Sequence, residues 1–593
     1  MFDKVLVANR GEIAIRVFRT LRELGMGSVA VYSEADRSAL HVSFADESFL
    51  IGPPPAAESY LRIDRIVETA QRAGAQAIHP GYGFLAENAT FARAVEEAGL
   101  VWIGPPPAAI ELMGSKTAAR TAMQAAGVPI IPGTTDPVGS VEELHALGEE
   151  IGYPLLIKAA AGGGGKGMEE VHTSRDAERA FETARRQGQS YFANPDVYVE
   201  KLIVDPRHVE VQVLADAHGN VIHLGERDCT IQRRHQKLIE ETPSPAVDEA
   251  LRERIGRIGV DAARACGYRS AGTIEGLLTR DGDYFFMEMN TRIQVEHTVT
   301  EMVTGVDLVR EQVRVALGEP LSLTQEQVEL RGHAIECRIN AEDVSRGFLP
   351  APALVTGYRE PSGPGVRVDS GVAAGNEVSG VYDPMIAKLI VHGADREHAR
   401  RRMLRALGEF WIEGPTTLVG FHKALLSHEC FVRGETCHGL VESEEIASRA
   451  AELEGVTPPP PSNTVSQGEG VGTIERVRTV EVDGRRFEVR IAEPEPAWAA
   501  LARRRRARGR AAGGGAGGLD AVVSPMQGTV LSVAVAEGDE VDGGQVICIV
   551  EAMKMENEVH AHRAGVVGQL SVESGQPVST GQVICVLTAE PAG

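Results

Sequence analysis

The last part of the chain contains an internal repeat, and this repeat restricts the fold more than any other feature. The segment GTVLSVAVAEGDEVDGGQVICIV, which starts at Gly528, aligns with GVVGQLSVESGQPVSTGQVICVL, which starts at Gly565. Turn glycines and the sequence Gly-Gln-Val-Ile-Cys match at one fixed offset. Each half alternates short apolar runs with glycine turns, which is typical of β-strands. The two halves therefore predict a small β-sandwich with approximate twofold symmetry.

The two halves are joined by the sequence Glu-Ala-Met-Lys-Met-Glu-Asn, residues 551–557. We expect this join to be an exposed hairpin with Lys554 at its tip. These residues resemble the biotinylation motif of biotin carboxyl carrier domains, in which the lysine is the modified residue. A lone lysine in a turn is usually only a solubilising charge, but the flanking Met553 and Met555 and the repeat on both sides favour biotinylation of Lys554. Lipoyl domains share the fold, but their lysine usually lacks the two methionines.

The chain of 593 residues is too long for one compact core, so we expect three or more domains. Near its start, Lys4-Val-Leu-Val-Ala reads as a strand, and the segment EIAIRVFRTLREL reads as an amphipathic helix that Gly25 ends. The segments AVYSEAD and QAIHPG repeat this strand-then-turn pattern. Strands that alternate with helices predict a parallel sheet with its site at the carboxyl ends of the strands.

Two linker-like tracts separate this region from the repeat. Pro458 to Pro461 begin a polar stretch that cannot bury enough surface to fold, and Gly513 to Gly518 form a tract expected to act as a swivel. Between them, residues 473–492 predict a small hairpin with its turn at Asp483-Gly484. We interpret the arginine cluster of residues 503–510 as a solvated or partner-docking linker rather than a nucleic-acid patch.

Composition argues against several classes of function. The net charge of −23 disfavours sequence-independent nucleic-acid binding, and no apolar stretch is long enough to span a bilayer. The first residues do not resemble a signal peptide. The seven cysteines are scattered without a C-x-x-C pair, which predicts free thiols in a reducing cytoplasm and disfavours a structural zinc site. We therefore expect a cytoplasmic protein that binds neither nucleic acid nor membranes.

The first 447 residues resemble biotin carboxylase along their whole length. The similar segments are ANRGEIA (8–14), HPGYGFLAEN (79–88), KAAAGGGGKGM (158–168), CTIQRRHQK (229–237), FMEMNTRIQVEH (286–297), ECRINAED (336–343) and YDPMIAKLIVHG (382–393). Together with the carrier-like repeat, this arrangement is similar to the α subunit of bacterial acyl-CoA carboxylases, whose carboxyltransferase is a separate chain.

The resemblance implies a multidomain α/β fold of the ATP-grasp type followed by an all-β biotinyl domain. The implied divisions are an N-terminal parallel α/β domain (1–114), an ATP-grasp domain with a glycine-rich lid (115–330), a carboxylase C-terminal domain (331–447), a linker with a small hairpin and a candidate partner-docking region (448–518) and the carrier domain (519–590). The carboxylase domains are expected to form a homodimer within a larger hetero-oligomer.

The resemblance also implies an ATP site. A four-glycine run can bring backbone N–H groups close to phosphates, although this run lacks the P-loop spacing because Gly167 follows Lys166. The residues implied to bind ATP are Lys116, Lys158, Gly164, Gly165, Glu200, Lys201, Leu202, Ile203, His208, His235, Glu275 and Glu288, with residues 200–203 beside the adenine. Glu275, Glu288 and Asn290 form an oxygen set that suits Mg²⁺ or Mn²⁺. We expect Glu288 to be buried within its apolar FFMEM run, and Glu288 and Asn290 to point to one face of a strand.

The remaining implied residues handle bicarbonate and biotin. Lys237, Arg292 and the backbone at Val295 resemble the bicarbonate site, in which an arginine can bind two oxygens at once. Glu296 would be the general base, and Arg338 would stabilise the biotin enolate. Tyr82, Gly83, Arg338 and Asp383 are the candidates for the biotin pocket. A thiol–amine base formed by Cys229 and Lys237 is disfavoured, and Cys229 is more simply a small buried residue.

The sequence departs from the family at three places. Glu169 and Glu170 follow the glycine run where relatives commonly carry a basic or apolar residue, and we expect them to face solvent. Thr298 stands where proline is usual, which predicts a looser turn. The segment 448–518 is shorter than the folded tethering domain of some relatives.

The leading hypothesis is an ATP- and bicarbonate-dependent carboxylation of biotin on Lys554, followed by delivery to a separate carboxyltransferase subunit that acts on acetyl-CoA or propionyl-CoA, as in fatty acid biosynthesis. Biotin protein ligase would attach the biotin. The alternatives are the biotin-carboxylating component of a pyruvate or urea carboxylase, and a non-catalytic biotin scaffold.

Overall fold

The structure is a computed structural model that describes residues 2–134, 136–159, 168–192, 194–454, 473–482, 485–494, 520–552 and 555–588. The chain divides into two compact units, residues 1–457 and 458–593. Among the described residues, no helix is both long and apolar enough to cross a membrane.

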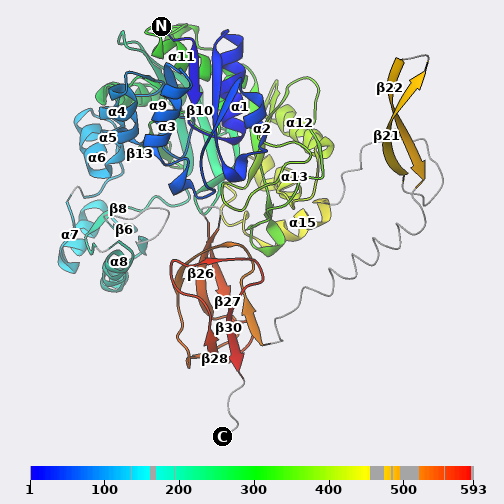
Figure 1. The fold of residues 1–593 in the computed structure, drawn as a ribbon. Coiled ribbons are helices and arrows are strands. Elements are labelled where there is room, and N and C mark those ends of the chain that lie inside the picture. Colours follow the sequence, from blue (N-terminus) through cyan, green and yellow to red (C-terminus); the bar gives the residue numbers. More distant parts are fainter. Residues whose placement is uncertain are drawn as a thin grey trace. The chain divides into compact units, whose positions relative to one another are not determined.

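The first unit begins with the predicted parallel α/β arrangement (Figure 1). Its five-stranded sheet has the order β3-β2-β1-β4-β5, and every neighbouring pair is parallel. The expected first strand and helix are present, and the helix ends before Gly25, which has a positive φ of 71°. The elements are β1 (Lys4–Val7), α1 (Gly11–Glu23), β2 (Gly27–Ser33), α2 (Leu40–Phe44), β3 (Glu47–Gly52), α3 (Ile63–Arg72), β4 (Ala77–His79), α4 (Ala89–Glu97), β5 (Val101–Trp102) and α5 (Pro107–Gly114).

An eight-stranded sheet forms the centre of the unit, with the order β13-β12-β9-β10-β11-β14-β19-β18. All its neighbouring strands are antiparallel. The strands are β9 (Arg207–Ala215), β10 (Val221–Arg233), β11 (Gln236–Thr242), β12 (Ser270–Leu278), β13 (Tyr284–Asn290), β14 (His333–Asn340), β18 (Val366–Ser370) and β19 (Met385–Gly393). The pairing of β11 with β14 carries the sheet across residue 330, where we place the boundary between two domains. That boundary stays a prediction.

A small lobe between residues 138 and 201 has a hydrophobic core of its own. Its three-stranded sheet has the order β7-β6-β8 and packs with two helices. The elements are α6 (Lys116–Ala125), which precedes the lobe, α7 (Val141–Ile151), β6 (Leu155–Ala159), β7 (Met168–Val171), α8 (Ala177–Phe192) and β8 (Val197–Lys201). The glycine run with Gly164 and Gly165 falls between β6 and β7 and lies outside the described residues.

Helices complete the first unit around the large sheet. They are α9 (Glu249–Ala265), α10 (His297–Thr304), α11 (Leu308–Ala316), α12 (Arg396–Glu409), α13 (Val419–Ser427), α14 (Glu429–Val432) and α15 (Glu444–Glu454). Short strands are β15 (Glu342–Asp343), β16 (Leu349–Pro350), β17 (Gly357–Arg359) and β20 (Trp411–Glu413).

The expectation that every thiol is free is wrong for two cysteines. Cys430 and Cys437 form a disulfide, with their Cα atoms 5.7 Å apart, and the chain between them turns at Gly434. That separation is within the range that a disulfide spans. The other five cysteines are free.

The second unit contains the predicted hairpin and the predicted sandwich. The hairpin pairs β21 (Thr473–Val482) with β22 (Arg485–Pro494), and its expected turn at residues 483–484 lies outside the described residues, as do the arginine cluster and both linker tracts. The sandwich has two four-stranded sheets with the orders β23-β30-β28-β25 and β27-β26-β24-β29. Its strands are β23 (Ala521–Val523), β24 (Gly528–Val533), β25 (Glu540–Val541), β26 (Val546–Ala552), β27 (Met555–His560), β28 (Gly565–Leu570), β29 (Pro577–Val578) and β30 (Val583–Thr588).

The sequence repeat appears directly in this sandwich. Strands β24, β25 and β26 of the first half correspond to β28, β29 and β30 of the second. The short strands are exchanged, because β25 pairs with β28 and β29 pairs with β24. At the join of the two halves, Ala552 at the end of β26 pairs with Met555 at the start of β27. Lys554 itself lies outside the described residues.

Candidate active site

The site is built around the ammonium group of Lys237, near the start of β11. Its Nζ lies 2.5 Å from a carboxylate oxygen of Glu210, 2.9 Å from one of Glu275 and 2.6 Å from one of Glu296. Glu210 is on β9 and Glu275 is on the neighbouring β12. The Lys237 side chain is only 11% exposed. A single buried cation therefore holds three carboxylates together.

Glu296 is held by a second cation. Arg338, on β14, donates from Nη2 to the other carboxylate oxygen of Glu296 at 2.8 Å, and from Nε to Glu240 at 2.6 Å. Glu296 is the residue that precedes α10 and is 2% exposed. Each of its oxygens thus has its own charged donor, which is the geometry of strong charge-assisted hydrogen bonds.

The charges around Glu296 decide its protonation. Burial opposes its ionised form, but Lys237, Arg338 and Arg227 outweigh burial and hold its pKa well below the ordinary value. Glu240 differs, because burial outweighs Arg338 and raises its pKa to about 7. Burial also raises the pKa of the Cys229 thiol well above its ordinary value. This agrees with the interpretation of Cys229 as a buried small residue and not as a base.

Arg292 lies at the edge of the same site, two residues after the end of β13. Its Nε donates to Glu87 at 3.0 Å and its Nη2 donates to Asn290 at 2.8 Å. Val295 follows three residues later, in the turn that leads into α10. The structure therefore brings Lys237, Arg292, Glu296 and Arg338 together from three separate segments of the sequence.

The three oxygen-bearing residues proposed for a metal lie on paired strands. Glu275 is directly opposite Glu288 and Asn290 is opposite Thr273, so Glu288 and Asn290 share one face of β13 as predicted. Asn290 donates to Glu275 at 2.7 Å. Lys237 and His208 hold the pKa of Glu275 below its ordinary value although burial opposes this.

The expected burial of Glu288 is wrong, because its side chain is exposed. β13 is the edge strand of its sheet, and the register shift beside Glu288 leaves Met287 exposed as well. Such irregularities turn side chains outward at sheet edges. The carboxylate of Glu288 has no hydrogen bond or ion pair among the described residues, yet it faces the ionised Glu275. Two facing carboxylates repel each other unless a cation lies between them, so this pair fits Mg²⁺.

The residues predicted for ATP are distributed over the small lobe and the sheet. Lys158 on β6 forms an ion pair with Glu200 on β8, and Lys201 donates to the carbonyls of Gly152 and Tyr153 at 2.9 Å each. Leu202 and Ile203 follow β8 and are half-buried. Lys116 is the first residue of α6, whose preceding Ser115 caps the helix.

The two histidines of this set differ in environment. His208, on β9, is buried and its Nε2 lies 2.8 Å from Glu275. Burial lowers its pKa, but Glu275 outweighs burial and the net shift is upward. His235 is exposed in the turn between β10 and β11 and has a positive φ of 65°.

The candidate biotin pocket is less closely assembled. The Tyr82 hydroxyl donates to Glu12 on α1, and burial raises the pKa of Tyr82 well above its ordinary value. Gly83 has a positive φ of 69°, a conformation that favours glycine. Asp383 is exposed and accepts a hydrogen bond from the backbone of Met385 at 2.9 Å.

Sequence reasoning missed several groups at the centre of the site. Arg227, on β10, is fully buried and donates to Glu210, Gln212, Thr273, Gln294 and Thr300. Glu210 and Glu240 are also missing from the predicted set. The sequence did contain a signal for them, because charged residues stand within the strand-forming segments 207–215 and 221–242. A charged residue in a buried strand needs a partner of opposite charge, so these residues could have been expected to pair.

Two of the three departures from the family can be located. Thr298 does not loosen a turn: it is buried in α10 and its hydroxyl donates to Glu336 on β14. Glu170 is exposed as expected, whereas Glu169 is half-buried and accepts a hydrogen bond from Gln187 at 2.9 Å.

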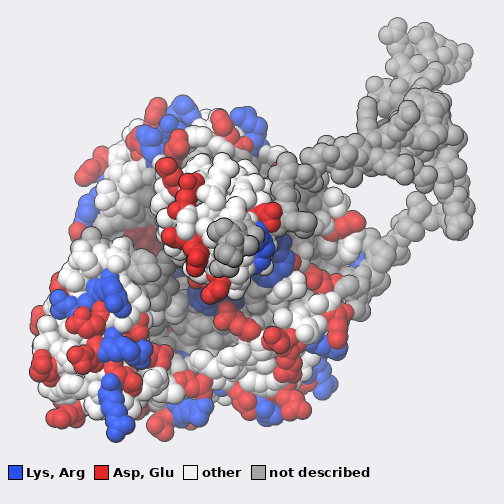
Figure 2. Space-filling model, turned by 90° about the horizontal axis from the view of Figure 1, so that it is seen from below, with Lys and Arg blue, Asp and Glu red and all other residues white. Residues whose placement is uncertain are grey.

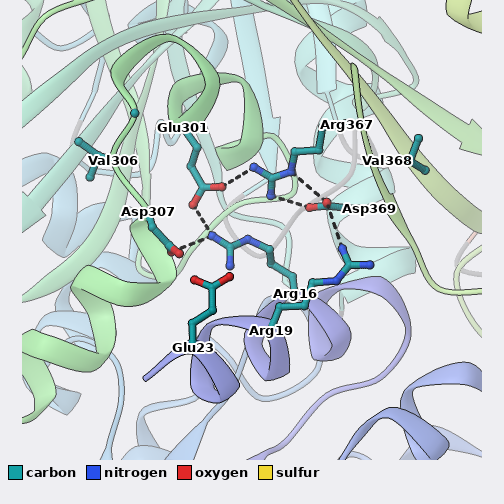
Figure 3. Close-up of a pocket in the computed structure, with 10 residues that line it drawn as sticks. Arg16, Arg19, Glu23, Glu301, Val306, Asp307, Arg367, Val368 and Asp369 are labelled. Carbon is teal, nitrogen blue, oxygen red and sulfur yellow. Dashed lines mark hydrogen bonds and ion pairs between the residues drawn. The ribbon is translucent and has the colours of Figure 1, made fainter. Parts of the chain in front are cut away.

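A separate cavity of about 320 Å³ lies beside α1, α10 and β18 (Figure 3). A guanidinium nitrogen of Arg16 lies 2.7 Å from a carboxylate oxygen of Glu301 and 2.7 Å from one of Asp307. The guanidinium nitrogens of Arg367 lie 2.7 Å from a carboxylate oxygen of Glu301 and 2.7 Å from one of Asp369. None of the predicted site residues lines this cavity. Most of its charges are paired with one another, and the cavity is distinct from the site around Lys237 because the two share no residue.

The surface of the described residues carries charges of both signs. Figure 2 shows acidic and basic side chains of the described residues interspersed over the face in view, without a continuous basic tract.

Four family descriptions match the chain in succession. They are "Biotin carboxylase, N-terminal domain" over residues 1–110, "Carbamoyl-phosphate synthase L chain, ATP binding domain" over 115–324, "Biotin carboxylase C-terminal domain" over 336–443 and "Biotin-requiring enzyme" over 520–587. Together they cover all the segments that carry the site and the sandwich.

Individual relatives agree with these matches. The biotin-dependent acyl-coenzyme A carboxylase alpha3 subunit of Mycobacterium leprae is 46% identical over 574 residues, 95% of each chain. A pyruvate carboxylase subunit of Methanothermobacter thermautotrophicus is 56% identical over 435 residues, 73% of this chain and 88% of that one. A solved biotin carboxylase domain dimer of the Hydrogenobacter thermophilus 2-oxoglutarate carboxylase, in complex with MgADP and bicarbonate, is 47% identical with a TM-score of 0.69, and covers 75% of this chain and 99% of that one.

Proposed function

Because this chain belongs to the biotin carboxylase family and carries a fused biotin domain, we propose that it is the biotin-carboxylating subunit of an acyl-CoA carboxylase. It is an ATP-dependent biotin carboxylase, a ligase whose cofactors are biotin, ATP and Mg²⁺. Among the described residues, the observation that carries the activity is the ammonium group of Lys237 surrounded by Glu210, Glu275 and Glu296, with Arg338 on the far oxygen of Glu296.

In this proposal the residues around Glu296 handle bicarbonate. Lys237, Arg292 and the backbone N–H of Val295 bind the anion. Glu296 enters the reaction ionised, because its neighbouring cations hold its pKa well below the ordinary value against the effect of burial. It can therefore accept the bicarbonate proton at neutral pH while bicarbonate attacks the terminal phosphate of ATP.

The cofactors add two functions to these residues. Lys554 would hold biotin, which would supply the carrier for the carboxyl group between this chain and the carboxyltransferase. Glu275, Glu288 and Asn290 would hold Mg²⁺, which would supply positive charge to offset that of the ATP phosphates. The phosphates of ATP would be held by Lys116, Lys158 and the glycine run. The rest of the nucleotide would contact residues 200–203, His208 and His235. The biotin ring would be held by Tyr82, Gly83, Arg338 and Asp383. Arg338 would bind the ring oxygen on which negative charge develops.

The acyl-CoA assignment is supported by the extent of similarity. The alignment with the Mycobacterium leprae acyl-CoA carboxylase chain covers 95% of this chain, and it therefore includes both the carboxylase and part or all of the biotin domain. The pyruvate carboxylase relative is more identical, but its alignment covers 73% of this chain. The proposed partners are a separate carboxyltransferase β subunit, biotin protein ligase and a second carboxylase unit in a homodimer.

The experiment combines the purified chain, biotinylated on Lys554, with candidate carboxyltransferase subunits encoded in the same genome and with acetyl-CoA, propionyl-CoA, pyruvate or urea as acceptor. We expect ¹⁴C-bicarbonate to be fixed into an acyl-CoA. Lys554→Arg is the matched control, because it keeps the charge but cannot be biotinylated: it should abolish this transfer and leave the carboxylation of free biotin unchanged. Fixation into pyruvate or urea alone would replace the acyl-CoA assignment, and transfer that survives in Lys554→Arg would refute the carrier assignment.

A further inference from the structure

A second buried lysine lies next to the site, and none of the roles described above uses it. Lys388, on β19, has no exposed side-chain surface. Its Nζ donates to the main-chain carbonyl of Val295 at 2.8 Å and lies 3.2 Å from a carboxylate oxygen of Glu12 on α1. Burying an ammonium group costs free energy unless the group is paired, so these two contacts determine the position of the Lys388 Nζ.

The first contact bears on the general base. The carbonyl of Val295 belongs to the peptide group that links Val295 to Glu296. When Lys388 holds this carbonyl, it fixes the orientation of the peptide from which the Glu296 side chain starts. The carboxylate of Glu296 is in turn fixed by Lys237 and Arg338. Lys388 therefore restrains the backbone of Glu296, while Lys237 and Arg338 restrain its carboxylate.

The second contact bears on biotin. Glu12 receives the Lys388 ion pair and accepts the hydrogen bond from the Tyr82 hydroxyl on the same oxygen, Oε1. The ammonium group also lies 5.9 Å from the centre of the Tyr82 ring, within range of a cation–π interaction. Lys388 thus contacts Tyr82 in two ways: its ammonium group faces the ring, and its ion pair partner Glu12 accepts the hydrogen bond from the Tyr82 hydroxyl.

Lys388 joins two segments that are far apart in sequence. The turn with Val295 and Glu296 precedes α10, and Tyr82 follows β4. On its own sheet, Lys388 is directly opposite Arg338 on one side and Asp369 on the other. The neighbour Arg338 also contacts Glu296. The lysine is therefore the one described cation that contacts both the base-bearing turn and the pair Glu12–Tyr82.

We propose that Lys388 is a positioning residue that sets the base-bearing turn and the biotin-lining tyrosine relative to each other, so that the proton acceptor and the biotin ring are correctly placed together. This inference rests on the proposed function, because it takes Glu296 as the base and Tyr82 as part of the biotin pocket. Lys388 itself does not touch substrate in this mechanism.

The test uses the full-length chain and separates positioning from folding. Lys388→Met removes the ammonium group but leaves Glu12 buried without its cation, which lowers the melting temperature. The double variant Lys388→Met/Glu12→Gln removes both charges and keeps an oxygen that can accept from Tyr82. We expect the double variant to recover most of the lost melting temperature, because an uncompensated buried charge is what costs stability.

The readout is steady-state ATP hydrolysis that depends on bicarbonate and is stimulated by free biotin. In both variants we expect kcat to fall on the order of 10- to 100-fold and the KM for biotin to rise, as for a misplaced base and a misplaced substrate. The KM for ATP should change less than about twofold, since the contacts of Lys388 given above involve none of the residues proposed to bind ATP. If Lys388→Met does not fold, the double variant alone carries the test.

The outcomes distinguish this inference from the proposed function. No bicarbonate-dependent hydrolysis by the wild type would refute the proposed function itself. An active wild type together with a stable double variant of unchanged kcat and KM for biotin would refute the role of Lys388. A loss that raises the KM for ATP as much as the KM for biotin would also overturn it, because that pattern indicates general damage.

Discussion

Replacing Lys237 by methionine should destabilise the chain strongly, and more at high pH than at low pH. The substitution keeps the length of the side chain but removes the ammonium group shared by Glu210, Glu275 and Glu296. Each carboxylate keeps one other cationic partner: Arg227, His208 and Arg338 respectively. Breaking a buried ion pair by removing one partner typically costs about 3–5 kcal/mol, so we expect a loss of this size in the free energy of unfolding at pH 8.

The pH dependence follows from the same geometry. In the wild type, Glu275 and Glu296 have lowered pKa values despite their burial, so both are ionised at neutral pH in the folded and unfolded chain. In Lys237→Met, burial is less opposed and one carboxyl group should take up a proton only in the folded state. Stability then rises as the pH falls, and the deficit should shrink by about 1.4 kcal/mol per pH unit for each such proton.

The assay is urea unfolding of both chains at pH 8 and pH 6, followed by tryptophan fluorescence. Lys4→Met is the matched control, because Lys4 forms an exposed ion pair with Glu47 at 2.8 Å, and its loss should cost less than about 1 kcal/mol at either pH. The reasoning is wrong if Lys237→Met is no less stable than Lys4→Met, or if its deficit is the same at both pH values.

Three other predictions concern the first unit. Burial raises the pKa of Glu342 to about 7 from an ordinary 4.5, so between these pH values the folded chain holds a proton that the unfolded chain has lost. The free energy of unfolding should therefore fall by up to about 3 kcal/mol as the pH rises from 5 to 8. Glu342→Gln should remove that part of the fall, and the same pH dependence of unfolding in the wild type and the variant would contradict this. Thr298→Val should lower the free energy of unfolding in urea by about 1–3 kcal/mol, because Glu336 loses a buried donor. The control Thr121→Val, on the exposed face of α6, should change it by less than about 0.5 kcal/mol. Equal effects of the two substitutions would refute the importance of the Thr298 hydrogen bond. Chelation with EDTA should stop bicarbonate-dependent ATP hydrolysis and added Mg²⁺ or Mn²⁺ should restore it, and hydrolysis that persists in EDTA would argue against the oxygen set of Glu275, Glu288 and Asn290.

Local patterns predicted the parts of the fold that depend on nearby residues. The strand–helix start of the chain and the strands of the carrier repeat follow from periodicity and glycine turns, and the structure has them as expected. The pairing of β21 with β22 was predicted in the same way. These features need no knowledge of how distant segments meet.

The composition of the site depends on strand order, which periodicity does not determine. Glu210 and Glu240 contact the predicted residues only because β9, β10, β11 and β14 are successive strands of the large sheet. The motif resemblance supplied Lys237, Arg292, Glu296 and Arg338, but it assigned no role to the buried partners Arg227 and Lys388. The exposure of Glu288 was missed for a related reason, since an apolar run does not reveal that its strand lies at a sheet edge with a register shift.

The central claim is that the cluster around Glu296 carboxylates biotin at the expense of ATP. The most direct measurement is ATP hydrolysis by the purified chain in bicarbonate, with and without free biotin, for the wild type and for Glu296→Ala. We predict biotin-stimulated hydrolysis in the wild type and its loss in a folded Glu296→Ala variant. No stimulation in a folded wild-type chain, or stimulation that is unchanged in Glu296→Ala, would contradict the claim.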